Sequence, residues 1–130
     1  MGGTVESYLD TNVVIYLHAG ATERLSIRAK QQIEDSNLLI SAMVILELQL
    51  LWEIGRLNYD AGRIFGDLSQ QIGLSLCPLA MKAVVHAACG IGWTRDPFDR
   101  IIVANAIANN KAPLITADRR IQGEYENAIW

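Results

Sequence analysis

Apolar residues occur along the chain in short runs and in longer segments with helical spacing. The short runs predict β-strands at 5–10, 37–41, 74–78 and 112–118, with 127–130 as an edge strand. Between them, apolar residues recur at the spacing of amphipathic helices. These predicted helices cover 11–20, 23–36, 41–55, 59–72, 79–92 and 97–111. The alternation predicts an α/β fold, with a central parallel sheet of four to five short strands flanked by helices on both faces.

Several predicted helices begin or end at residues that favour those positions. Ser41 is a good N-cap for the helix that follows it, and Gly55 is a good stop. Pro97 suits the first position of a helix, where its missing N–H costs nothing.

Length and composition predict one domain over residues 1–130. A chain of 130 residues that is 51% hydrophobic can bury a core but has no room for two domains. No apolar run approaches the roughly 20 residues of a membrane span, and the start "MGGTVES" lacks the pattern of a secretory signal. We therefore expect a cytoplasmic protein without a membrane partner.

Glu47 lies in the middle of a helix whose composition is that of a protein core. Its neighbours on the same helix face are apolar: Met43, Val44, Leu50 and Leu51. An ionised carboxylate placed against hydrocarbon is costly unless a partner, a cation or a proton compensates it. Glu47 either reaches water from the edge of the apolar stripe, pairs with a distant arginine, or belongs to a site.

Four aspartates stand at strand ends and helix starts. Asp10 and Asp118 each follow an apolar strand, and Asp96 and Asp99 flank Pro97. Asp10, Asp96 and Asp118 can each be explained as N-caps, and Asp99 as a first-turn acid favoured by the helix dipole. However, ligand sites of parallel sheets form at the carboxyl ends of the strands, so Asp10 and Asp118 should point into one region.

Taken together, these acids predict a metal site. A cluster of like charges repels itself unless a divalent cation neutralises it. Oxygen ligands without histidine or cysteine suit a hard ion such as Mg²⁺ or Mn²⁺. Because Mg²⁺ held by carboxylates commonly takes further ligands from phosphate, the expected chemistry is hydrolysis of phosphate esters or diesters.

Four segments in order resemble the PIN-domain family. They are "YLDTNVVIYL" (8–17), "SAMVILEL" (41–48), "RDPFDRIIVANA" (95–106) and "LITAD" (114–118). Their order and spacing are most similar to those of the VapC-type ribonuclease toxins of bacterial and archaeal toxin-antitoxin pairs. The likeness spans residues 8–130 and implies a single PIN-like domain.

The resemblance also implies the residues of the site. The implied metal-binding and catalytic acids are Asp10, Glu47, Asp99 and Asp118. Asp96 is an auxiliary member that either binds the metal or only caps its helix. Asn12 and Thr116 match small polar positions that could hold a water or orient a carboxylate.

The reaction implied by the resemblance is metal-assisted hydrolysis of RNA, with one or two Mg²⁺ or Mn²⁺ ions, to a 5′-phosphate and a 3′-hydroxyl. A net charge of −3 argues against a basic RNA-binding surface. Without the five site acids, however, 9 of the 14 acidic residues remain against 11 Lys and Arg. The arginines that flank the acidic motifs could contact RNA phosphates or be solvated or ion-paired instead. They are Arg95, Arg100, Arg119 and Arg120.

VapC-like proteins are commonly homodimers that a small antitoxin protein neutralises, so the resemblance implies both partners. Two other functions compete with this interpretation. A haloacid dehalogenase-type phosphatase also begins with a strand-end Asp, but it needs a second Asp where this chain has Asn12. A non-catalytic PIN-like module would bind RNA or protein without cutting, and the intact set of acids argues against it.

Overall fold

Five short parallel strands form one sheet in the computed structural model, which describes residues 5–130. The strands are β1 (Glu6–Leu9), β2 (Asn37–Ile40), β3 (Ser75–Leu76), β4 (Leu114–Ile115) and β5 (Ala128–Ile129). They pair in the order β3-β2-β1-β4-β5. The predicted parallel sheet is confirmed. Residues 1–4 lie outside the described residues, and they include the beginning of the segment "MGGTVES", for which we expected no secretory signal.

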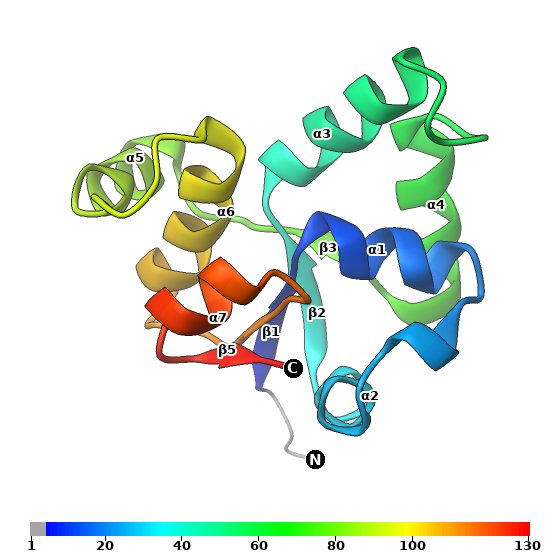
Figure 1. The fold of residues 1–130 in the computed structure, drawn as a ribbon, viewed down its shortest axis with the longest axis horizontal. Coiled ribbons are helices and arrows are strands. Elements are labelled where there is room, and N and C mark those ends of the chain that lie inside the picture. The colour runs from blue at the N-terminus through cyan, green and yellow to red at the C-terminus, as the bar shows by residue number, and fades with distance from the viewer. Residues whose placement is uncertain (1–4) are drawn as a thin grey trace.

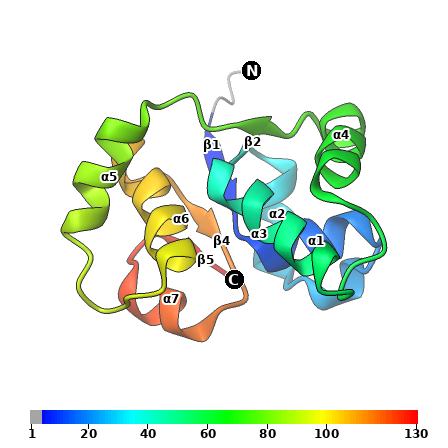
Figure 2. The same ribbon diagram turned by 90° about the horizontal axis from the view of Figure 1, so that it is seen from above.

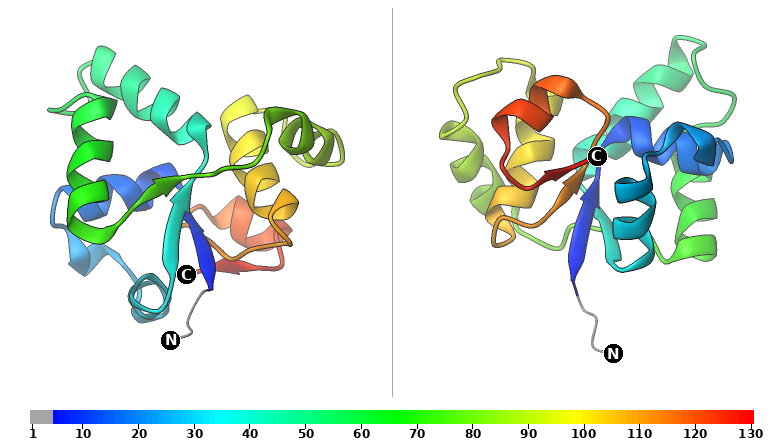
Figure 3. Two further views of the ribbon diagram at one scale, coloured as in Figure 1. Left: turned by 180° about the vertical axis from the view of Figure 1, so that it is seen from behind. Right: turned by 60° about the horizontal axis from the view of Figure 1, so that its bottom comes forward.

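Helices cover both faces of this sheet, as predicted. They are α1 (Thr11–His18), the 3-10 helix η1 (Thr22–Arg24), α2 (Ile27–Glu34), α3 (Ala42–Glu53), α4 (Ala61–Ile72), α5 (Met81–Cys89), α6 (Pro97–Ala108) and α7 (Arg119–Glu124). In Figures 1 and 2, α1 to α4 lie to one side of the strands and α5 to α7 to the other. Seen from behind, the two groups keep this separation (Figure 3). No helix of the described part of the chain is long and apolar enough to span a membrane.

The core is built around the central strand. Tyr8 and Leu9 of β1 and Leu114 and Ile115 of β4 are fully buried, and Val13 and Val14 of α1 cover them. The chain reaches β2 and β3 on one side of β1 and then crosses to β4 and β5 on the other. The carboxyl ends of β1 and β4 therefore meet where the strand order reverses, which is where α/β sheets place their ligand sites.

The helix boundaries predicted at Ser41, Gly55 and Pro97 are confirmed, whereas the helices predicted over 79–92 and 97–111 are shorter, at Met81–Cys89 and Pro97–Ala108. Ser41 caps α3 by accepting a hydrogen bond of 3.1 Å from the Met43 backbone N–H, and Gly55 follows the helix with a positive φ of 80°. Such a φ favours glycine because it has no Cβ. Asp96 caps α6, and Pro97 takes its first position.

The prediction of one helix over 23–36 is wrong at its start. Ser26 accepts a hydrogen bond of 3.0 Å from the Ala29 backbone N–H, so α2 begins at Ile27, and the preceding residues form η1 instead. The strands predicted at 74–78 and 112–118 are shorter than expected, with two residues each. β3 is an exposed edge strand, so little packing supports a longer one.

Candidate metal centre

Four acidic side chains from four different parts of the fold line one hollow of about 180 Å³. Asp10 directly follows β1, and Asp118 stands just beyond β4. Glu47 comes from the middle of α3, and Asp99 from the first turn of α6. The structure thus brings together the four acids that the sequence singled out. Thr11, Asn12, Ile15 and Leu51 complete the lining.

Asp10 is buried, with 5% of its surface exposed, and both of its oxygens accept hydrogen bonds. Oδ1 accepts from the Thr11 backbone N–H at 2.8 Å, and Oδ2 accepts from the Thr116 hydroxyl at 2.6 Å. Burial raises the pKa of Asp10, the hydrogen bonds from Thr116 and Thr11 oppose that rise, and the nearby charge of Asp118 adds to it. Asp10 is therefore both the predicted helix cap and a wall of the hollow.

Thr116 connects the two acids that follow strands. Its hydroxyl donates to Asp10 and accepts a hydrogen bond of 3.0 Å from the Asp118 backbone N–H. Asp118 in turn begins α7, because its Oδ1 accepts from the backbone N–H groups of Arg120 and Ile121 at 2.8 and 3.1 Å. Oδ1 of Asp118 is committed to the helix, which leaves Oδ2 as the oxygen available to a ligand.

Glu47 is half-buried and accepts a hydrogen bond from the Thr11 hydroxyl. Burial raises its pKa, the Thr11 hydrogen bond lowers it, and the charges of Asp10 and Asp96 raise it further. The expected apolar face is only partly buried, since Val44 is enclosed but Leu50 is 40% exposed. Among the described residues, no Lys, Arg or His forms an ion pair with Glu47, so the proposed pairing with a distant arginine is not found there.

The pKa of Asp99 shows the effect of the neighbouring carboxylates most clearly. Burial and the carboxylates of Asp96, Asp10, Asp118 and Glu47 together raise the pKa of Asp99 to about 7. Asp96 itself is exposed and does not line the hollow. Its Oδ1 caps α6 by accepting from the backbone N–H groups of Phe98 and Asp99 at 2.8 and 3.4 Å. Of the two roles left open for Asp96, its contacts support the cap.

Two further polar groups belong to the hollow. The side-chain oxygen Oδ1 of Asn12 is buried and has no hydrogen-bond partner, which is costly unless a ligand or water satisfies it. Thr11, which holds Glu47, was missed by the sequence analysis. The signal was present in "LDTN", where a hydroxyl stands between the strand-end acid and Asn12.

The donors of this hollow fit a hard divalent cation better than a soft one, because all of them are oxygens. Within residues 5–130, no three acidic, histidine or cysteine side chains converge into a ready-made metal cage. Mg²⁺ is commonly bound through only one or two carboxylates and otherwise by water and substrate phosphate, so it does not need such a cage. The orphaned oxygen of Asn12 is a further candidate partner for a metal-bound water.

The four predicted RNA-contacting arginines fall into different environments. Arg95 and Arg119 are exposed next to the capping acids of α6 and α7. Arg120 donates a hydrogen bond to the Trp93 carbonyl and lies over the Trp93 ring, 5.7 Å from its centroid. Arg100 donates from Nε to the Ala88 carbonyl at 3.0 Å, which joins α6 to α5. Arg100 is therefore engaged in packing, whereas Arg95 and Arg119 remain open to solvent.

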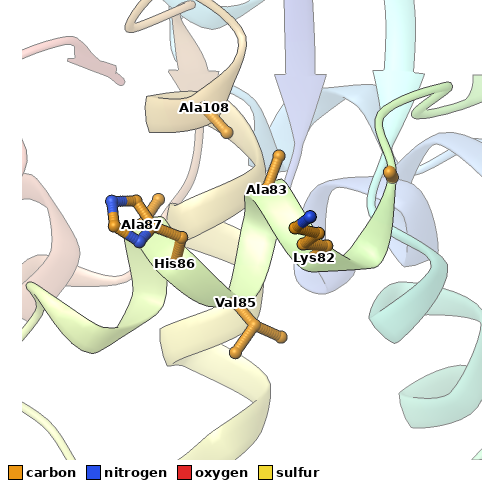
Figure 4. Close-up of a pocket in the computed structure, with 7 residues that line it drawn as sticks. Lys82, Ala83, Val85, His86, Ala87 and Ala108 are labelled. Carbon is orange, nitrogen blue, oxygen red and sulfur yellow. The ribbon is translucent and has the colours of Figure 1, made fainter.

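A larger hollow, of about 740 Å³, lies over α5 and α6, but its chemistry is different. Figure 4 shows its lining of alanine side chains with Val85, Lys82 and His86, without any carboxylate. Size alone therefore does not identify the site. The small hollow at the strand ends is the better candidate because it gathers the three carboxyl groups whose pKa values are raised, those of Asp10, Glu47 and Asp99.

This is an α/β protein with a parallel sheet and an acidic hollow at the point where the strand order reverses. The family model of the PIN domain matches residues 7–125, and the chain therefore belongs to the PIN-domain family. Comparison with curated proteins gave no match.

Two solved structures share the fold. The chain is similar to a structure of VapBC2 from Rickettsia felis bound to a DNA fragment from their promoter, with 15% identity and a TM-score of 0.63 over 95% of this chain and 96% of that one. It is also similar to PAE2754 from Pyrobaculum aerophilum, with 21% identity and a TM-score of 0.57 over 98% and 86%. At these identities the likeness concerns the fold.

Proposed function

We propose that this chain is a divalent-metal-dependent endoribonuclease and the toxin of a toxin-antitoxin pair. The observation that carries the proposal is the convergence of Asp10, Glu47, Asp99 and Asp118 on one hollow. No cationic side chain of residues 5–130 forms an ion pair with any of them. Carboxylates that are kept together without compensation are what a site for a cation and a phosphate requires.

The four acids would hold Mg²⁺ or Mn²⁺, and the bound ion would supply an activated water and offset the charge that develops on the phosphate. The protein's own contribution is positioning. Thr116 fixes the Asp10 carboxylate, and Thr11 fixes that of Glu47, so neither can rotate freely out of the hollow. Without metal, burial and the neighbouring carboxylates raise the pKa of Asp99 to about 7, and a bound cation would offset that repulsion.

RNA is the proposed substrate because PIN membership agrees with the phosphodiester chemistry expected from the acids. A small antitoxin protein that covers the hollow is the proposed partner, in line with the VapBC2 complex of similar fold. We further propose a homodimer that acts in the cytoplasm. Apolar side chains of α3 and its C-cap give such protein partners a surface, since Leu46, Leu50 and Ile54 are 48%, 40% and 65% exposed.

The test is an RNA cleavage assay. Purified protein is incubated with structured RNAs in Mg²⁺, Mn²⁺ or EDTA, beside Asp10→Asn and Glu47→Gln. Asp60→Asn serves as the matched control because Asp60 also caps a helix, through the Arg63 backbone N–H at 2.9 Å, but lies outside the hollow. The parent and Asp60→Asn should cut in metal, and the two site variants should not.

The proposal fails if the parent leaves every RNA whole in both metals, or if the site variants cut as well as the parent does. A folded parent that binds RNA in either metal without cutting it would instead favour the non-catalytic PIN-like module.

A further inference from the structure

A second cavity continues from the acidic hollow along α1. It measures about 350 Å³ and is lined by Ile15, His18, Ala19, Leu57, Asn58, Tyr59 and Ile64. Ile15 lines this cavity and the acidic hollow alike. Thr11, Ile15 and His18 share one face of the helix, and the seven steps from Thr11 to His18 cover about 10 Å. The two depressions therefore adjoin at Ile15 on α1, and we refer to them together as the groove.

The walls of this cavity combine apolar surface with a few polar groups. Ile15, Leu57 and Ile64 supply the apolar part, and the Tyr59 ring is 47% exposed beside them. Asn58 adds an exposed amide. This mixture and the volume of about 350 Å³ are typical of small-molecule binding pockets.

His18 is held in a defined orientation at the edge of the cavity. Its Nε2 lies 2.8 Å from Asp67 Oδ2, and its ring meets the Tyr59 ring edge-on at 5.6 Å between centroids. The contact with Asp67 occupies one ring nitrogen and leaves Nδ1 as the nitrogen that can serve a ligand. The ring can therefore offer a fixed hydrogen-bonding partner without reorganising.

Two arginines stand next to lining residues of the cavity, one of them paired with a carboxylate. Arg63 lies over Tyr59, with its guanidinium carbon 4.9 Å from the ring centroid, and is anchored to Asp67 by a contact of 3.0 Å. Arg56 is exposed beside Leu57. Asp67 offsets the charge of Arg63 in part, so these arginines add a modest positive charge that phosphates of a bound strand can contact.

We propose that this cavity binds one unstacked base of the RNA, next to the bond presented to the acidic hollow. The inference rests on the proposed function and names a subsite of the same groove. A base has two apolar faces and a polar edge, which match the apolar walls and the groups offered by Asn58 and His18. An apolar side chain of a protein partner would fill the walls but leave these polar groups without partners, which is costly.

The inference is tested by binding rather than by cutting. Fluorescein-labelled pentaribonucleotides of A, C, G or U, and a pentamer whose central nucleotide is abasic, are titrated in EDTA at low salt by fluorescence anisotropy. Every probe carries the same number of phosphates, so differences in affinity report the bases. At least one base should bind roughly five- to a hundredfold more tightly than the abasic probe, the range expected when a base stacks in a pocket.

Three variants locate that preference. Tyr59→Leu removes the aromatic wall, and Ala19→Phe fills the mouth of the cavity from an exposed position. Both should bring the preferred base down to the affinity of the abasic probe. Tyr16→Leu is the control, because Tyr16 also carries an arginine over its ring, Arg24 at 4.8 Å, but does not line the cavity. It should retain the preference, with folding of all variants checked by thermal melting.

The inference is overturned if base and abasic probes bind equally, if the cavity variants keep the preference, or if Tyr16→Leu loses it as well. It is also overturned if the cavity variants bind every RNA like the parent and lose only the affinity for a partner protein. If the protein shows the base preference but cleaves no RNA in metal, the nuclease proposal fails and the subsite is retained. If the protein cleaves RNA and the cavity variants cleave it with unchanged rate and base preference, the subsite fails and the nuclease proposal is retained.

Discussion

Thr116 donates a hydrogen bond of 2.6 Å to Asp10, and both residues are buried at the carboxyl ends of adjacent strands. The same hydroxyl accepts a hydrogen bond from the Asp118 backbone. One small side chain therefore sets the positions of two acids that are distant in sequence. This arrangement makes Thr116 a positioning residue whose effect can be separated from that of the acids.

Thr116→Val keeps the shape of the side chain but removes the donor to Asp10. We expect a loss of about 1–3 kcal/mol in the free energy of unfolding at pH 7, because the buried Asp10 carboxyl group loses a hydrogen bond. Cleavage should fall together with metal affinity. Urea unfolding and an RNA assay measure the two effects, and Thr116→Ser, which restores the hydroxyl, should recover most of both. Equal losses in the valine and serine variants would show that packing, and not the donor, matters here.

Glu47→Gln should separate function from stability. The Thr11 hydroxyl can still donate to the glutamine oxygen, while the repulsion from Asp10 and Asp96 disappears. The free energy of unfolding of the variant should equal that of the parent or exceed it by up to about 1 kcal/mol, a figure reduced for solvent screening of this half-exposed side chain. Cleavage should be lost. A strong drop in the melting temperature would instead identify Glu47 as a structural partner in the fold.

The pKa of Asp99 predicts how stability depends on pH without metal. Its pKa is about 7 in the folded protein, above the ordinary value of 3.8, so the folded state binds the proton more tightly than the unfolded one. The stability that Asp99 contributes is therefore fully present below about pH 4 and is lost as the pH rises through 7.

Measured against Asp99→Asn in EDTA, the parent should lose on the order of 1–2 kcal/mol between pH 4 and pH 8, a figure discounted because the side chain is partly exposed. Urea unfolding at several pH values provides the comparison. Parallel stability curves for the two proteins would contradict a raised pKa at Asp99.

Metal should stabilise the protein more strongly at alkaline pH. A ligand that binds only the folded state at a hundred times its Kd adds about 2.7 kcal/mol to stability. Since protons and metal compete for the carboxylates, the rise in melting temperature with Mn²⁺ should be larger at pH 8 than at pH 6. Asp10→Asn should lose most of this rise, and Asp60→Asn should keep it. A rise of equal size in all three proteins would place the metal elsewhere.

The sequence predicted the sheet because strands depend on local apolar runs, whereas the grouping of all four acids was implied by the resemblance to the PIN-domain family. Apolar runs marked β1, β2 and β4, and Asp10 and Asp118 were placed together by the geometry of parallel strands alone. The start of α2 was missed because Ser26 competes with earlier residues as a cap, which only tertiary packing decides.

Thr11 and Arg100 were harder to assign for a different reason. Their roles depend on partners distant in space, Glu47 for Thr11 and the Ala88 carbonyl for Arg100, and no local pattern reveals such contacts. The cavity beside His18 was likewise invisible, since it arises where α1 meets the turn before α4.

The four arginines should separate into two groups by their salt dependence. Arg95 and Arg119 are exposed beside the acids, so Arg95→Ala and Arg119→Ala should each weaken RNA binding and lower the slope of log affinity against log salt by about 1. Arg100→Ala should leave that slope unchanged and cost about 1 kcal/mol of stability, because it removes the hydrogen bond to Ala88.

Fluorescence anisotropy at four NaCl concentrations, with urea unfolding alongside, measures both quantities. Arg28→Ala is the control, because Arg28 is exposed on α2, which leads into the opposite end of the sheet. Arg28→Ala should change neither quantity. A slope change in Arg28→Ala as large as that in Arg119→Ala would mean that the RNA does not approach the protein from the α6–α7 side, and one in Arg100→Ala would mean that Arg100 contacts phosphate rather than serving packing alone.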